Sequence, residues 1–239
     1  MDSDELGTEV DSVAPLRLRG VSWGPPKLIA AGDPPLFEGL DLTLERGTWL
    51  GLMGESGTGK TTILSLCAGL LRAQKGSVEL MGRSVEAMSD DEISRTRATS
   101  VGLIFQNFHL DDSKTSLENI VLPGYFSDLN WHSLNQRAKA LAERLGLSPH
   151  LNKSTSVLSG GQRQRVAVCR ALIASPKLIL ADEPVGSLDE ATASLVLDVL
   201  TEFVSQGNSI MSVTHSRQVL ERVDSHQVLR DRCLTPVNN

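Results

Sequence analysis

The chain has 239 residues, enough for one large α/β domain or for a domain with an inserted subdomain. Apolar residues make up 40% and charged residues 22%, and the net charge of −6 leaves no basic footprint for a nucleic-acid partner. No apolar run approaches the roughly eighteen residues of a membrane span, and no signal peptide opens the chain, so we expect that it does not cross a bilayer by itself.

The three cysteines are far apart in the sequence and odd in number. Cys67 and Cys169 fall within apolar helical patterns, where a free thiol behaves as a small buried apolar group. We therefore expect the protein in a reducing, intracellular compartment.

Order is expected to begin near residue 15, because residues 1–14 contain five acidic residues and no basic one and predict a loose tail. The Gly- and Pro-rich residues 24–35 predict a long loop. Apolar alternation or continuous apolar runs predict strands at 16–23, 36–45, 48–53, 76–82, 101–105, 177–182, 209–214 and 225–229. Apolar residues at helical spacing predict helices at 61–68, 90–97, 116–122, 133–145, around 196–203 and at 217–222.

The first motif is the run Gly54-Glu-Ser-Gly-Thr-Gly-Lys-Thr61, which fits the phosphate-loop pattern G-x-x-x-x-G-K-[ST]. A buried strand precedes it and an apolar helix follows it, which is the context that phosphate binding requires. Glycines let successive amides turn toward phosphate oxygens, and the helix start adds its positive dipole end. Lys60 can reach the β/γ-phosphates, and Thr61 can ligate Mg²⁺. Taken alone, the motif leaves open a glycine-rich turn that binds nothing.

The second motif is the pair Asp182 and Glu183 at the end of the most apolar strand. Burying two carboxylates without partners is costly, which disfavours a purely structural role. Because the carboxyl ends of parallel strands face a ligand crevice, we expect Asp182 to hold Mg²⁺ and Glu183 to orient and deprotonate the attacking water. The alternative is an exposed turn before Pro184.

The third motif, Leu158-Ser-Gly-Gly-Gln162, resembles the signature sequence of ABC-type ATPases. Ser159 can cap the following helix, and Gly160 and Gly161 leave the N-terminal amides open to an anion. An ordinary N-cap with a glycine turn would look the same in isolation. Its position between a helical segment and the carboxylate strand matches the family, and the resemblance extends from about residue 16 to 230.

The resemblance implies roles for further residues. Gln106 resembles the glutamine that joins Mg²⁺ and water to the helical subdomain, His215 resembles the switch histidine at the γ-phosphate, and Asp189 lies in the segment that communicates between subunits. Trp23 falls where the family stacks an aromatic ring on adenine, although packing in the core is an open alternative. The implied sites are, for ATP, Trp23, Gly54, Glu55, Ser56, Gly57, Thr58, Gly59, Lys60, Thr61 and Thr62; for catalysis, Lys60, Gln106, Glu183 and His215; for Mg²⁺, Thr61, Gln106 and Asp182; and for the signature, Ser159, Gly160, Gly161 and Gln162.

The same resemblance implies the fold class, an α/β P-loop NTPase of the ABC-ATPase type. Such a fold has a mainly parallel core sheet, an antiparallel β subdomain and an inserted helical subdomain, here at about 107–175. One ATPase domain would span residues 15–232, and a C-terminal tail would follow at 233–239. Two copies would pair head to tail in an ATP-dependent homodimer, each ATP held between one phosphate loop and the partner's signature, and would hydrolyse ATP to ADP and phosphate.

Residues 105–110, 117–123 and 181–189 look most like the lipoprotein-release and macrolide-export (LolD/MacB-type) group. The chain would then be a cytoplasmic subunit on the inner face of the cell membrane that powers a separate integral membrane permease. A coupling helix of that permease would dock beside Gln106 and residues 107–125. Candidate contacts are Phe108, Leu110 and Tyr125, although their packing within the helical lobe is an equal alternative.

Two other classes of function have related sequence features. An ATPase of a non-transport mechanotransmission complex, which regulates periplasmic or cell-wall enzymes, would share every motif described. A soluble ABC protein of DNA repair or translation would carry long coiled coils, tandem cassettes or a basic face, and the sequence has none of these.

Overall fold

The computed structural model describes residues 13–127 and 129–237. The strands are β1 (Leu16–Trp23), β2 (Phe37–Leu44), β3 (Trp49–Gly54), β4 (Lys75–Leu80), β5 (Arg83–Ser84), β6 (Val101–Ile104), β7 (Leu178–Asp182), β8 (Ser209–Val213), β9 (Ser225–Arg230) and β10 (Cys233–Val237). The α-helices are α1 (Pro26–Ala30), α2 (Lys60–Cys67), α3 (Asp90–Ser100), α4 (Ser116–Val121), α5 (Trp131–Arg144), α6 (Gly160–Leu172), α7 (Glu190–Ser205) and α8 (Arg217–Leu220). Short 3₁₀ helices are η2 (Val85–Ala87), η3 (Leu122–Phe126), η4 (Ser148–His150) and η5 (Thr155–Val157).

The strands form two sheets. A four-stranded antiparallel sheet has the order β2-β1-β4-β5, and a six-stranded sheet has the order β10-β9-β3-β8-β7-β6. In the larger sheet every pairing is parallel except that of β10 with β9. The predicted α/β class, with a mainly parallel core sheet and an antiparallel β subdomain, is confirmed. The carboxyl ends of β3, β6 and β7 therefore meet at one edge, where ligands bind in such sheets.

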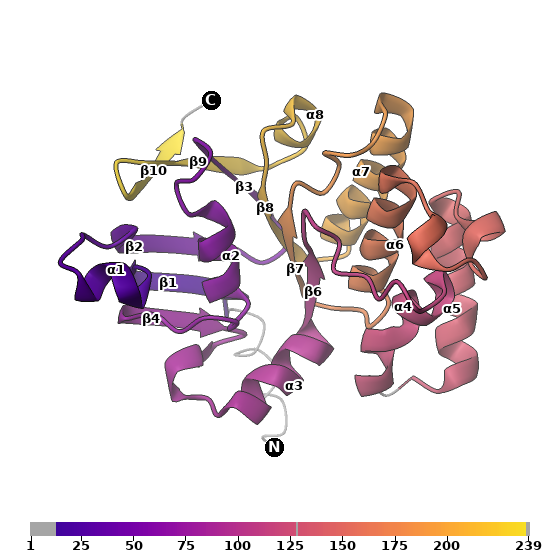
Figure 1. Ribbon diagram of the computed structural model, residues 1–239, viewed down its shortest axis with the longest axis horizontal. Coiled ribbons are helices and arrows are strands. Elements are labelled where there is room, and N and C mark those ends of the chain that lie inside the picture. The colour runs from indigo at the N-terminus through magenta and orange to yellow at the C-terminus, as the bar shows by residue number, and fades with distance from the viewer. Residues whose placement is uncertain (1–12, 128, 238–239) are drawn as a thin grey trace, which may run out of the picture.

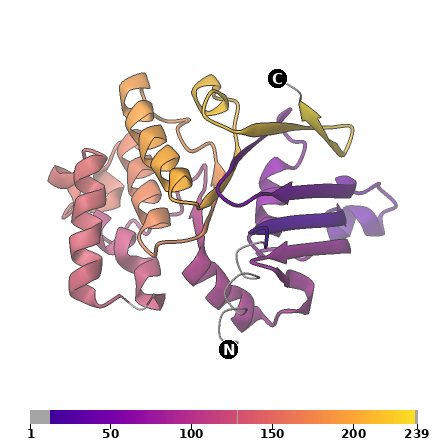
Figure 2. The ribbon, with the colours of Figure 1, turned by 180° about the vertical axis from the view of Figure 1, so that it is seen from behind.

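Two apolar cores lie on either side of the parallel sheet. One lies between the two sheets and includes Leu18 of β1, Leu52 of β3 and Ile63 of α2. The other lies under α6 and α7 and includes Val168 and Val196. Figures 1 and 2 show α4 and α5 on the outside of α6, at the end of the molecule farthest from the antiparallel sheet. These helices occupy the predicted helical insertion.

Three segments differ from the sequence prediction. Residues 26–30 form α1 within the predicted loop, because a proline at the first turn is compatible with a helix. Helical structure continues past the predicted end at residue 122, because η3 follows α4 directly and holds Pro123 in its first turn. Residues 233–237, predicted as a tail, form the edge strand β10, where Pro236 is tolerated at the sheet margin.

The chain termini and cysteines bear on two further expectations. Residues 1–12 of the predicted acidic tail lie outside the described residues. Ala14, at the predicted end of that tail, is already buried.

The thiols of Cys67 and Cys169 are buried, as their apolar helical patterns predict. Burial raises the pKa of both thiols to about 12, which suits inert apolar groups. Within the described residues, no helix combines the length and the hydropathy that crossing a bilayer would need.

Candidate functional site

The phosphate loop joins β3 to α2, as its sequence predicts. Gly54 has φ 153° and Gly59 has φ 101°, both in the region that residues with a side chain rarely adopt. A Cβ atom at Gly54 would lie 2.8 Å from the Leu229 carbonyl oxygen, and one at Gly59 would lie 2.6 Å from Leu36 Cδ2. Backbone conformation therefore favours glycine at both positions, and at Gly54 the Leu229 carbonyl also leaves no space for a side chain.

Lys60 folds back onto this loop and is only 8% exposed. Its ammonium donates to the carbonyl oxygens of Gly54, at 2.7 Å, and Glu55, at 2.6 Å. Burial lowers the pKa of Lys60, while the charges of Asp182 and Glu183 oppose that shift. The Lys60 ammonium is thus held against the phosphate loop by two carbonyl oxygens.

Two of the three predicted Mg²⁺ ligands meet across the sheet edge. The Thr61 hydroxyl at the start of α2 donates to Asp182 Oδ2 at 2.7 Å, and Asp182 is 4% exposed at the end of β7. A hydroxyl and a carboxylate oxygen are the kinds of donor that Mg²⁺ prefers. These residues therefore fit a magnesium ion.

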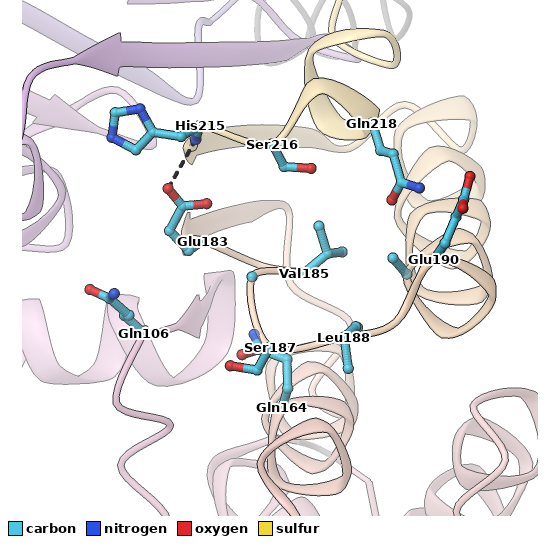
Figure 3. Close-up of a pocket in the computed structure, with 12 residues that line it drawn as sticks. Gln106, Gln164, Glu183, Val185, Ser187, Leu188, Glu190, His215, Ser216 and Gln218 are labelled. Atoms are coloured by element: carbon cyan, nitrogen blue, oxygen red, sulfur yellow. Dashed lines mark hydrogen bonds between the residues drawn. The ribbon is translucent and has the colours of Figure 1, made fainter.

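A cavity of about 610 Å³ lies beside this pair and gathers the other predicted catalytic residues. Gln106, Glu183 and His215 all line it, although they follow three different strands. Figure 3 shows Glu183 between Gln106 and His215, with the histidine ring extending away from the carboxylate. Gln164, Glu190 and the segment 185–188 complete much of the wall.

Glu183 is held in one orientation. Its backbone has φ 50°, unusual for a residue with a side chain, and its amide donates to the Val213 carbonyl. The carboxylate accepts from the His215 amide at 2.9 Å and from the Thr214 hydroxyl at 3.0 Å. Thr214 did not emerge from the sequence, because its neighbour His215 carries the recognisable motif.

The signature residues lie apart from this cavity. Ser159 caps α6, accepting from the Gln162 amide, while Gln162 Oε1 accepts from the Ser159 amide at 3.0 Å. Ser159 and Gly160 are exposed, and a Cβ atom at Gly160 would meet nothing within 4 Å. None of residues 159–162 lines the Glu183 cavity or the smaller cavity beside Gly54 and His215. The start of α6 at Ser159 and Gly160 is thus open to solvent.

Asp189 and Trp23 occupy defined positions as well. Asp189 caps α7 by accepting from the Thr192 amide and hydroxyl, and these bonds lower the pKa of its carboxyl group.

Trp23, half-buried at the end of β1, stacks on Phe37 with ring centroids 6.4 Å apart. Phe37 in turn lies against Gly59, since a Cβ there would be 3.3 Å from its ring. Trp23 is therefore one side chain away from the phosphate loop.

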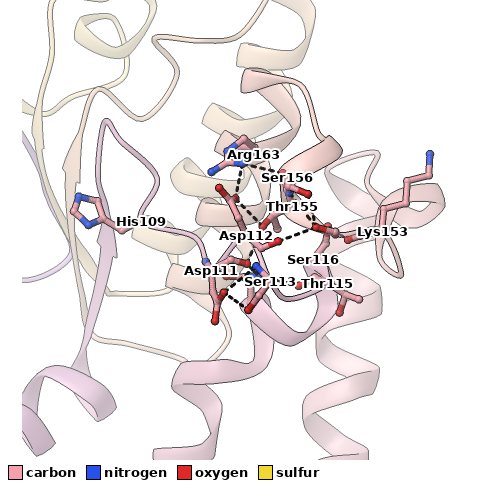
Figure 4. A network of polar contacts seen from close by, with 12 residues as sticks. His109, Asp111, Asp112, Ser113, Thr115, Ser116, Lys153, Thr155, Ser156 and Arg163 are labelled. Atoms are coloured by element: carbon pink, nitrogen blue, oxygen red, sulfur yellow. Dashed lines mark hydrogen bonds and ion pairs between the residues drawn. The ribbon is translucent and has the colours of Figure 1, made fainter.

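Two arginines that the sequence analysis did not single out tie the segment after Gln106 to α6. Arg170 donates to the carbonyls of Phe108 and His109, which have φ 58° and 49°. Arg163 binds Asp112 at 2.7 Å within the polar network of Figure 4. Its guanidinium also lies over the Phe108 ring. Burial lowers the pKa of Arg170 to about 10, so its charge persists at neutral pH.

Comparison with known proteins identifies the family. Residues 37–186 match the family described as ABC transporter, and this stretch contains the phosphate loop, the signature and both carboxylates. The chain belongs to the ABC transporter family. This ABC ATPase resembles the lipoprotein-releasing system ATP-binding protein LolD of Alcanivorax borkumensis, with 40% identity over 214 residues that cover 87% of the chain and 94% of LolD. The predicted membership of the LolD/MacB-type group is confirmed.

Two further relatives of this ABC ATPase are an export protein and an uncharacterised ABC transporter ATP-binding protein. The macrolide export ATP-binding/permease protein MacB of Nitrosomonas europaea is 36% identical over 90% of the chain, which covers 33% of that protein. The ABC transporter ATP-binding protein YknY of Bacillus subtilis is 34% identical, with coverage of 85% of the chain and 89% of YknY.

Solved structures agree with this assignment. The ATP-binding cassette MJ0796, in a dimeric post-hydrolysis state with ADP and Pi, matches this ABC ATPase with a TM-score of 0.86 and 28% identity, over 93% of this chain and 98% of the other. A second dimeric structure of MJ0796 gives a TM-score of 0.87 at 28% identity, over 94% and 99% of the two chains.

Proposed function

We propose that this ABC ATPase hydrolyses ATP to power a separate membrane permease, for export or for extraction of lipoproteins or other substrates, at the cytoplasmic face of the cell membrane. The observation that carries the proposal is the meeting of Gln106, Glu183 and His215 at one cavity beside Thr61 and Asp182. Similarity to LolD over most of both chains, and to export proteins such as MacB, supports the link to transport.

ATP binding would exchange contacts within the phosphate loop. The Lys60 ammonium now satisfies two carbonyl groups, and it would donate instead to the β/γ-phosphate oxygens of ATP. The amides of residues 55–62 would surround the phosphates, and Trp23 would stack on the adenine ring.

Hydrolysis would use the residues of the cavity. Thr61, Asp182 and Gln106 would hold Mg²⁺, which supplies positive charge to the phosphate oxygens when bound. Glu183, whose two carboxylate oxygens are oriented by the Thr214 hydroxyl and the His215 amide, would accept a proton from the water that attacks the γ-phosphorus. His215 would contact the γ-phosphate through its ring.

The signature would act in a second copy of the chain. Ser159 and Gly160 are exposed and line neither cavity near the phosphate loop, which favours a site completed by a partner subunit. The dimeric structures of MJ0796 are consistent with this arrangement. ATP would hold the two copies together, and its hydrolysis would release them.

The permease would dock at a second cavity of about 610 Å³. This cavity lies between α3, η3 and α6, and its walls include His109 and Phe126. Of the three predicted contacts, Tyr125 is 60% exposed and stacks on Trp131. Leu110 packs against the core and Phe108 lies under Arg163. Phe126, whose side chain is 67% exposed, is therefore a better candidate for contact with the permease than Leu110 or Phe108.

The permease assignment is tested by purifying the tagged protein from detergent-solubilised membranes of its own cell and identifying the membrane subunit that accompanies it. Phe126→Asp should remove that subunit, since a charge would enter the apolar wall of the cavity. Leu28→Asp is the matched control, because Leu28 is also exposed but lies on α1. Equal recovery of the membrane subunit with both variants would rule out docking at this cavity.

A further inference from the structure

His150 lies directly beside the signature although it belongs to no recognised motif. It ends η4, between the buried side chains of Leu147 and Leu151, and its Nε2 atom is 3.2 Å from the side-chain nitrogen of Gln162. Gln162 is the residue whose side chain closes the capping box with Ser159. The ring is therefore one side chain away from the exposed start of α6.

The hydrogen bonds around Gln162 determine the state of this ring. Because Gln162 Oε1 accepts from the Ser159 amide at 3.0 Å, its amide nitrogen is the group that faces His150, and that nitrogen only donates. His150 Nε2 must therefore accept, which leaves the ring proton on Nδ1. Nδ1 is buried and has no partner in the described residues, so Gln162 is the contact that fixes the tautomer.

Protonation of the ring is incompatible with this arrangement. An imidazolium carries a proton on both nitrogens, so Nε2–H would oppose the Gln162 amide hydrogens. If the Gln162 amide turned over to accept, its nitrogen would face the Ser159 amide, and the capping box would be lost. The charged groups that act on the ring are Lys153 and Arg165, both positive, and burial together with these charges lowers the pKa of His150.

We propose that His150 is a positioning residue for the signature: its neutral Nδ1–H form holds Gln162 and, through it, the Ser159 cap, and protonation releases both. The contact itself is a property of the single chain. Its consequence for catalysis rests on the proposed function, in which Ser159 contacts ATP bound by the partner subunit. Because the pKa of His150 is lowered, the contact is complete at neutral pH and is lost as the pH falls below that pKa.

The contact is tested directly by nitrogen NMR of the imidazole rings in the ¹⁵N-labelled chain, with His150 assigned by its loss in His150→Gln. The expected spectrum at pH 7.5 has the proton on Nδ1, the less common neutral tautomer, and titrates below the ordinary histidine value. Gln162→Glu should preserve the capping box and place a carboxylate oxygen against Nε2, so the titration midpoint should rise by about 1 pH unit and the neutral tautomer should change to Nε2–H. An Nε2–H tautomer in the unaltered chain, or a midpoint that Gln162→Glu leaves unchanged, would overturn the proposal.

The functional consequence is tested through ATP-dependent dimerisation in a Glu183→Gln background, measured by light scattering between pH 5.5 and 7.5. Acidification should weaken the dimer of the Glu183→Gln chain by a factor on the order of five, which is the effect of losing one helix cap. The comparison is the same chain with His150→Gln, whose side-chain oxygen accepts a hydrogen bond at every pH. Its dimer should therefore weaken less on acidification. His132→Gln is the matched control, since His132 lies exposed on α5. An identical pH dependence in His150→Gln would overturn the positioning role.

The two measurements separate the possible failures. If the chain forms no ATP dimer at any pH, the proposed function fails, while the NMR result still decides whether His150 holds Gln162. If the dimer forms but the tautomer is Nε2–H, the positioning role fails and the proposed function stands.

Discussion

At the scale of single residues, the two adjacent carboxylates differ because their neighbours differ. Asp182 ends a fully buried strand and is paired with the Thr61 hydroxyl. Glu183 is half-buried, and its positive φ turns it toward the cavity, where the His215 amide and the Thr214 hydroxyl fix it. One carboxylate is thus suited to hold a cation, and the other is suited to face a water molecule.

Glu183→Gln is therefore expected to lower ATP turnover by about 10²- to 10⁴-fold, the usual contribution of a general base. ATP binding should persist, because Lys60 and the phosphate loop are unchanged, and an ATP-bound dimer should accumulate. Steady-state phosphate release and light scattering measure the two effects. Glu143→Gln, an exposed carboxylate on α5, is the control and should be indistinguishable from the unaltered chain. Turnover within a few-fold of normal would remove Glu183 from the role of base.

At the scale of elements, α6 links two regions of the site. Its start carries the signature, and further along the helix Arg163 and Arg170 bind the segment that follows Gln106. Asn119 of α4 pins the same segment, since its side chain accepts from the Asp111 amide and donates to the carbonyls of Asp111 and Thr115. Movement of this segment is therefore coupled to α4 and α6 through polar contacts.

Asn119→Ala should lower the free energy of unfolding by about 1–3 kcal/mol, because the Asp111 amide would lose its acceptor and the carbonyls of Asp111 and Thr115 would each lose one of their donors. Asn152→Ala, at an exposed position near η4, should change it by less than about 0.5 kcal/mol. Urea unfolding of both variants measures the difference. Equal stabilities would mean that water replaces the Asn119 contacts at no net cost.

At the scale of the whole molecule, the arrangement of the sheet separates two halves of the proposed site. The parallel strands bring the phosphate loop, Asp182 and Gln106 to one edge, whereas the exposed start of α6 lies outside both cavities there. Such an arrangement favours a site shared between two copies of the chain.

Gly160→Asp tests this sharing without disturbing the fold. A side chain at residue 160 meets open space, and an acidic group in the first turn suits the helix dipole, so the melting temperature should not fall. ATP-dependent dimerisation should be lost, because the new carboxylate would face phosphate oxygens. Mixing Gly160→Asp with Lys60→Ala should restore association, since one subunit supplies an intact phosphate loop and the other an intact signature. No recovery in the mixture, measured by light scattering with ATP, would favour a site contained in one chain.

The sequence by itself determined the features that depend on local geometry. The phosphate loop, the continuously apolar strand before Asp182 and the Ser159 cap each need particular residue types at fixed spacings, so local pattern is sufficient to find them. It was insufficient for α1, because the Gly- and Pro-rich residues 24–35 predict a loop although a first helical turn tolerates proline. It was also insufficient for β10, which pairs with β9 at the sheet edge in the segment expected as a tail.

Only the tertiary structure decided which distant residues meet. Arg170 lies 62 residues after Phe108 and 61 after His109, whose carbonyls it binds, and no periodicity relates these positions. The same is true of Thr214 with Glu183 and of His150 with Gln162, whose contacts arise from how strands and helices pack. Such pairs are set by packing across the fold, a physical property that short-range sequence patterns do not encode.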